Sequence, residues 1–221
     1  MTIPSVWLAV LLALLITALL YRYLSSKKIE EWYWNSFFLY FLVWKLSYIL
    51  FHFKMVIEMP LSIVYFNGST EGHFLALASL SVYLLYKVSK KYPSAHQDAL
   101  QLFPLFFISF EGIKYALISS TLAAIAHLLL LICYVVFQTI SSAKSNKGAD
   151  SSISFNRAIS KKKKEILSLQ AFALMMLSEL LVVSFFQPII SLEILTFSWL
   201  AITVYTLSIL DHKKRSAKPT S

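Results

Sequence analysis

The sequence is poor in the residues that soluble domains use for turns, cross-links and a solvated surface. Of 221 residues, four are glycine, six are proline, one is cysteine and 14% are charged. Soluble domains average about a quarter charged residues. A lone cysteine, Cys133, excludes an intrachain disulfide and a cluster of metal-binding thiolates. With so little charge, most of this chain requires an apolar environment.

Long apolar runs are what the sequence has instead, and 58% of its residues are hydrophobic. A run of about twenty apolar residues crosses the roughly 30 Å of bilayer hydrocarbon as a helix. No run alternates like barrel strands, and an open sheet would leave its backbone groups unpaired in lipid. We therefore predict an all-α, polytopic membrane bundle of about seven transmembrane helices. The predicted spans are 4–22, 34–53, 72–88, 99–118, 120–140, 166–187 and 191–210, in one bundle over 1–212 that precedes a disordered basic tail, 213–221.

The basic residues predict the orientation of these spans, because lysine and arginine accumulate on the cytoplasmic side of membrane proteins. All of them except Lys45, Lys54 and Lys114 fall on one side if the number of spans is odd. The amino terminus is then outside and the carboxyl terminus is cytoplasmic. The first apolar run is interpreted as a retained span, because its positive charges follow it instead of preceding it.

The same sorting accounts for the formal net charge of +9. A nucleic-acid binder presents its basic residues on one accessible face. Here they form short blocks between apolar runs, as at 161–164, so we predict no nucleic-acid partner. Such a block can attract anionic headgroups, but fixing the orientation is the simpler role.

Two connecting segments are long. The outer one, 53–71, is half apolar, and it contains Pro60 and the turn-like Asn67-Gly68-Ser69. It either lies along the outer interface, as a plain loop would, or dips back into the bundle. The cytoplasmic one, 141–160, is rich in serine and lysine.

Ionisable residues within the predicted spans are the main candidates for function. Each costs about 2.5–3.5 kcal/mol to insert, so it normally faces a bundle interior or a watery cavity. They are Lys45, Glu111, Lys114, His127 and Glu179.

We expect four of these residues to form a roughly neutral cluster in the outer half of the bundle. Glu111 and Lys114 are three residues apart on one helix face, which allows a local ion pair. Lys45 and Glu179 are the expected interhelical pair. The cluster either lines a cavity that admits a lipid headgroup or peptide, or consists of paired ions that only align the helices.

The histidines have weaker signals. His73, at the outer mouth of the third predicted span, could act as a general base near neutral pH or be a tolerated polar residue. His127 is expected to form a hydrogen bond within the bundle. The sequence contains no metal-ligand spacing, phosphate-binding glycine loop or nucleophile elbow, so neither a metal nor a cofactor is predicted.

Several short motifs follow one another in a recognisable order. They are Lys45-Leu46-Ser47-Tyr48, Met59-Pro60-Leu61, Asn67-Gly68-Ser69-Thr70-Glu71-Gly72-His73, Phe110-Glu111-Gly112-Ile113-Lys114 and the segment 178–188. In this order, and in seven spans with an outer amino terminus, the chain resembles bacterial prolipoprotein diacylglyceryl transferase. The resemblance implies a protein of the bacterial cytoplasmic membrane that binds phosphatidylglycerol and transfers its diacylglyceryl group to the cysteine of a lipoprotein precursor.

Five side chains are the candidate ligand-binding residues, and His73 is a weak catalytic candidate. The five are Lys45, Tyr48, Glu111, Lys114 and Glu179. The chain departs from the family pattern where the sixth-span arginine becomes Glu179 and its glutamate becomes Val183. A carboxylate in place of a guanidinium repels the phosphate that the family has to hold.

The leading hypothesis is therefore a diverged relative that binds phospholipid or a membrane-anchored protein in an outer-leaflet polar cavity, with the parent catalytic residues largely lost. One alternative is an active, phosphatidylglycerol-dependent diacylglyceryl or acyl transferase, in which Lys45, Lys114 and His73 act on the substrate. The other is a transporter or an accessory subunit of a membrane complex. Broken helices or paired repeats would favour transport, and neither is clear in the sequence.

Overall fold

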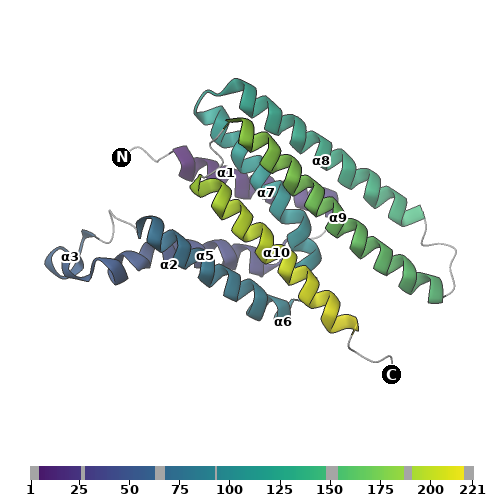
Figure 1. Cartoon of the computed structure of the whole chain (residues 1–221), viewed down its shortest axis with the longest axis horizontal. Coiled ribbons are helices and arrows are strands. Elements are labelled where there is room, and N and C mark those ends of the chain that lie inside the picture. The colour runs from purple at the N-terminus through teal and green to yellow at the C-terminus, as the bar shows by residue number, and fades with distance from the viewer. Residues whose placement is uncertain are drawn as a thin grey trace. The chain divides into compact units, whose positions relative to one another are not determined.

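A computed structural model describes residues 5–25, 28–62, 68–92, 94–147, 154–186 and 191–216 (Figure 1). All regular elements within these ranges are helices, which confirms the predicted all-α class. They are α1 (Ser5–Ser25), α2 (Glu31–Phe51), α3 (Phe53–Glu58), α5 (Ser69–Val82), the π-helix η1 (Tyr83–Val88), α6 (Ser89–Lys91), α7 (Ala95–Leu117), α8 (Thr121–Lys147), α9 (Ser154–Phe186) and α10 (Leu192–Ser216).

Six of the described helices contain a stretch long and apolar enough to cross a bilayer. These stretches are Val6–Ser25, Glu31–Phe51, Ala95–Leu117, Thr121–Ile140, Ser168–Phe186 and Leu192–Leu210, and each coincides with a predicted span. The remaining predicted span, 72–88, falls on α5 and η1, and α6 follows η1 directly. These three helices have only 14, 6 and 3 residues. A seventh span and the orientation of the termini stay predictions.

The outward surface of these helices is apolar. On α1, the exposed side chains Leu11, Leu15 and Leu19 recur every fourth residue and therefore form one stripe. On α8, Leu122, Leu129 and Ile132 are likewise exposed. Water disfavours apolar patches of this extent, whereas lipid accommodates them. The chain is thus a helical, membrane-embedded protein.

The chain divides into two compact units, and each combines segments that are distant in sequence. Unit 1 comprises Met1–Ile29 and Gln97–Phe197, which include α1, nearly all of α7, α8, α9 and the first turns of α10. Unit 2 comprises Glu30–His96 and Ser198–Ser221, which include α2, α3, α5, η1, α6 and the rest of α10. The prediction of one bundle over 1–212 stays a prediction.

In unit 1, α8 lies alongside α9, and α1 packs on α8 (Figure 1). An aromatic group holds α7 to its neighbours, because the ring of Phe103 lies 6.0 Å from those of both Phe172 and Phe197. At the other end of the unit, the buried Tyr21 hydroxyl donates a hydrogen bond to Asp98 Oδ1 at 2.7 Å. These contacts position the helices that carry the buried ionisable residues.

In unit 2, α2 and α5 pack side by side (Figure 1). Their close approach depends on Gly68 and Gly72, because a Cβ atom on either would overlap the Ser47 hydroxyl. The Gly68 amide then donates a hydrogen bond directly to the Trp44 carbonyl at 3.1 Å. Small residues four apart are a common way for membrane helices to bring their backbones together.

The structure corrects the predicted carboxyl-terminal boundary. Helix α10 runs to Ser216, so the first residues of the predicted disordered tail, 213–221, are helical, and 217–221 lie outside the described residues. The predicted cytoplasmic segment 141–160 is also partly helical, since α8 reaches Lys147 and α9 starts at Ser154. The predicted outer segment contains the exposed helix α3, and its residues 63–67 lie outside the described ranges.

Candidate functional site

The described part of unit 1 contains a group of ionisable residues from four different helices, which we call the ionic cluster. Its members are Glu111 and Lys114 on α7, His127 on α8, Glu179 on α9 and Glu193 on α10. The first four are buried, with exposed fractions of 4%, 6%, 0% and 1%, respectively. Burial of so many charges is costly unless they compensate one another.

Connectivity within unit 1 explains why these residues lie at the same level. Glu111 and Lys114 are near the carboxyl-terminal end of α7, and a short turn leads from there to the amino-terminal end of α8, which carries His127. In this turn Ser119 has a φ of 61°, and the Ser120 amide donates to the Tyr115 carbonyl at 2.9 Å. Glu179 and Glu193 lie in the same way on either side of the α9–α10 connection.

Lys114 links α7 and α10 at the partly exposed edge of the ionic cluster. Its Nζ lies 2.5 Å from Glu111 Oε2 and 2.5 Å from Glu193 Oε2. The predicted ion pair between Glu111 and Lys114 is therefore confirmed. Glu193 was not predicted as a site residue, because its place in the first turn of a span suggested only a residue near the membrane surface. Ser191 accepts a hydrogen bond from the Ile194 amide at 3.2 Å and so begins the helix that carries Glu193.

His127 and Glu179 form the deepest part of the cluster. His127 Nδ1 lies 2.8 Å from the Ala123 carbonyl, which can only accept, so Nδ1 carries a proton and donates. The other ring nitrogen, Nε2, lies 3.5 Å from Glu179 Oε1. The ring also stacks on Tyr115, with centroids 5.3 Å apart. The hydrogen bond expected for His127 within the bundle is present, whereas its pairing with Glu179 was not foreseen.

Glu179 is the unusual member of the pair. Both carboxyl oxygens are shielded from solvent, and neither accepts a hydrogen bond from any residue that the structure describes. A buried carboxylate normally has several donors, because an unsatisfied one is strongly destabilised in a low dielectric. The side chain therefore requires a proton, a cation or a hydrogen-bond donor that the described residues do not place on it.

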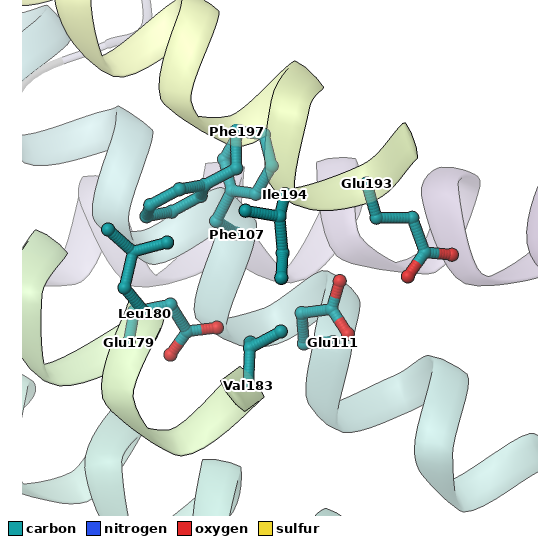
Figure 2. A pocket seen from close by; sticks show the side chains of 8 residues that line it. All are labelled: Phe107, Glu111, Glu179, Leu180, Val183, Glu193, Ile194 and Phe197. Carbon is teal, nitrogen blue, oxygen red and sulfur yellow. The ribbon is translucent and has the colours of Figure 1, made fainter. Parts of the chain in front are cut away.

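A small pocket opens beside these residues (Figure 2). Figure 2 shows the carboxyl groups of Glu111, Glu179 and Glu193 around it. The rest of the lining is apolar: Phe107, Leu180, Val183, Ile194 and Phe197. The pocket has room for about one water-sized group, so it fits an ion or the end of a ligand.

The other predicted site residues belong to unit 2. His73 Nδ1 lies 2.5 Å from the Tyr40 hydroxyl, so α2 and α5 hold this histidine between them. Tyr48 is 3% exposed, and its hydroxyl donates to Met55 Sδ at 3.9 Å. Lys45 is partly exposed on α2. The pairing of Lys45 with Glu179, and the ligand-binding or catalytic roles of all these residues, stay predictions.

No group of three or more histidine, cysteine, aspartate or glutamate side chains within the described ranges could hold a metal ion. The six apolar helices and the ionic cluster together define a multi-pass membrane protein with a polar site between its helices. Compared with known proteins, the chain matches no family model, no curated protein and no solved structure. The resemblance to prolipoprotein diacylglyceryl transferase therefore stays a prediction.

Proposed function

We propose that this protein binds the primary ammonium group of a membrane lipid in the pocket of unit 1, without performing diacylglyceryl transfer. The observation that carries the proposal is the convergence of three carboxyl groups, from Glu111, Glu179 and Glu193, on one small pocket. An ammonium group is about the size of a water molecule and offers three hydrogen-bond donors. It could therefore satisfy the Glu179 oxygens that lack donors.

The charge of the pocket argues against a phosphate. Lys114 is the cation of the ionic cluster nearest the three carboxyl groups, and it already contacts Glu111 and Glu193. A phosphate at the pocket would meet more negative than positive charge, which is unfavourable in a low dielectric. The rings of Phe107 and Phe197, which also line the pocket, are compatible with an ammonium group. The favoured phospholipid is thus one with an amine headgroup instead of phosphatidylglycerol.

Binding can be tested by thermal unfolding of the purified protein in detergent with added lipids. We expect phosphatidylethanolamine to raise the unfolding temperature more than phosphatidylglycerol or phosphatidylcholine, whose quaternary ammonium has no N–H donor. Glu179→Gln should abolish the selectivity, whereas the matched control Glu58→Gln, on the exposed helix α3, should keep it. Adding free ethanolamine in place of the lipid shows whether the stabilising amine has to be part of a lipid. Equal or stronger stabilisation by phosphatidylglycerol would contradict the proposal.

We further propose that the amino terminus is outside, in a bacterial cytoplasmic membrane, so that the pocket opens toward the outer leaflet. The sorting of the basic residues supports this orientation. In a Cys133→Ser background, we expect a membrane-impermeant thiol reagent to label Glu58→Cys in intact cells but Lys90→Cys only after lysis. The reverse pattern would place the pocket at the inner leaflet.

A transferase activity is the second candidate function, and one contact in unit 2 favours it. The 2.5 Å approach of the Tyr40 hydroxyl to His73 orients an imidazole that could act as a general base. Complementation of a strain depleted of its diacylglyceryl transferase tests this candidate, with precursor modification measured by mass spectrometry. Modification that is lost in His73→Ala but kept in the exposed control His52→Ala would replace the lead proposal with an enzyme.

A further inference from the structure

The buried part of the ionic cluster is not electrically balanced. Glu111 and Glu179 bring two carboxyl groups, whereas Lys114 brings one ammonium group, and all three are at most 6% exposed. If both carboxyl groups were ionised and His127 were neutral, one negative charge would remain uncompensated. An isolated buried charge is destabilised by several kcal/mol, so groups in this situation change their protonation state instead.

We infer that His127 and Glu179 together hold one exchangeable proton, in addition to the one on His127 Nδ1, and that this proton neutralises the buried cluster. The inference applies when no cation occupies the pocket, because a bound ammonium group would itself compensate the excess negative charge. The proton adds to a free lone pair and breaks no bond. It resides either on His127 Nε2, giving an imidazolium beside a carboxylate, or on a Glu179 oxygen, giving a carboxylic acid beside a neutral imidazole.

The geometry places the proton between these two residues. Nδ1 of His127 is occupied by its hydrogen bond to the Ala123 carbonyl, so Nε2 is the ring atom that can accept. Nε2 faces Glu179 Oε1 at 3.5 Å, and neither atom has a hydrogen-bond partner within the described residues. Small movements of either side chain would bring the two atoms within hydrogen-bond distance.

The charged and titratable groups that surround the pair in the described chain belong to α7 and α10. From α7 it faces Glu111 and the stacked ring of Tyr115, and from α10 Glu193 lines the same pocket as Glu179. Lys114 is engaged by Glu111 and Glu193. Helix α1, which packs on α8, has no ionisable residue between positions 6 and 20.

A partly exposed carboxyl group lines the same pocket as Glu179. Glu193 has a side chain that is 39% exposed, and it lines the pocket with the buried Glu111 and Glu179. Chains of carboxylates and histidines at membrane depth characterise proton relays in pumps and transporters. The order Glu193, Glu111, Glu179, His127 thus runs from the partly exposed mouth to the buried end of the cluster.

Infrared difference spectroscopy of the full chain in lipid nanodiscs tests this inference, because it detects protonated carboxyl and imidazolium groups directly. We expect acid and base titration of the wild type to change one of these signals. His127→Asn should transfer the proton to Glu179, so that a carboxylic acid band appears or grows. Glu179→Gln removes the excess negative charge, so the exchangeable signal should disappear.

Two further variants keep the test decisive. Glu111→Gln removes the same excess charge without altering the pair, so it should also abolish the signal even if Glu179→Gln does not fold. Glu58→Gln, on the exposed α3, should leave it unchanged. Folding of each variant is checked by gel filtration. Spectra in which neither Glu111→Gln nor His127→Asn differs from the wild type would overturn the inference.

Discussion

The two units contain their polar side chains in different ways. In unit 2, one group of uncharged side chains is mutually satisfied: Ser81 and Thr203 have hydroxyl oxygens 3.1 Å apart, and the Trp199 indole N–H donates to Ser81 at 2.9 Å. In unit 1, ionisable groups are buried together, and Glu179 is left without a donor in the described chain. The satisfied group around Ser81 indicates a structural role, whereas the incompletely satisfied carboxyl group of Glu179 indicates that something else binds there.

The largest difference between the units should appear when a charge is removed from the ionic cluster. Lys114→Met leaves Glu111 and Glu193 facing each other without their shared cation. Breaking a buried ion pair in this way costs about 3–5 kcal/mol. We expect a large fall in unfolding temperature, measured by fluorescence-detected gel filtration after heating. Glu111→Gln in the Lys114→Met background should recover part of the loss, and absence of any recovery would argue against this electrostatic explanation.

The stability of unit 2 should be most sensitive to enlargement of its small residues. Gly72→Ala places a Cβ where it overlaps the Ser47 hydroxyl, and overpacking of this kind costs roughly 1–3 kcal/mol. Removing that hydroxyl with Ser47→Ala should partly restore stability, although the Ser47 Cβ would still lie 3.2 Å from the new atom.

Gly112→Ala in unit 1 is the matched control. Its Cβ would meet only His127 Cβ, at 3.3 Å, so we expect a smaller loss of stability than for Gly72→Ala. If both alanine variants melted at the same temperature, close backbone packing would not distinguish the units.

The loss of one hydrogen bond to a charged group should have an effect of similar size. Tyr21→Phe removes the donor to the buried Asp98 carboxylate in unit 1, and bonds to charged groups contribute about 1.5–3 kcal/mol. Chemical denaturation in mixed micelles measures this loss. The control Tyr23→Phe changes a tyrosine that is 77% exposed on the same helix, and it should have no measurable effect.

The smallest effect is expected from a neutral hydrogen bond in unit 2. Thr203→Val removes the hydroxyl that lies near Ser81 and donates to the Trp199 carbonyl at 2.9 Å. Hydrogen bonds between membrane helices contribute about 0.6 kcal/mol on average, so the loss should be close to that value. A cost for Thr203→Val as large as that for Tyr21→Phe would remove the proposed contrast between ionic and neutral contacts.

Much of the fold was predictable because lipid imposes simple requirements. Six predicted spans coincide with apolar helices, since a run such as 120–140 has few stable alternatives to a helix in a bilayer. The π-helical geometry of Tyr83–Val88, in the third predicted span, could not be predicted because it depends on local packing. The helical end of α10 was missed because charged residues at a helix end look the same in sequence as a disordered tail.

The residues of the candidate site were predictable from the sequence, but only one of their pairings was. Glu111, Lys114, His127 and Glu179 were noticed because ionisable residues in apolar spans are costly. The contact between Glu111 and Lys114 followed from their spacing of three on one helix. Gly68 and Gly72, which lie four residues apart, were a signal for close packing that could have been used.

By itself, the sequence determined that this protein is helical and membrane-embedded, because hydrophobicity acts on each segment independently of the others. It also determined which residues had to be sheltered from lipid. Only the tertiary structure decided that Glu193 joins Lys114, and that His127 faces Glu179. These pairings join helices separated by many residues, so their geometry depends on how the helices pack and cannot be obtained from local periodicity.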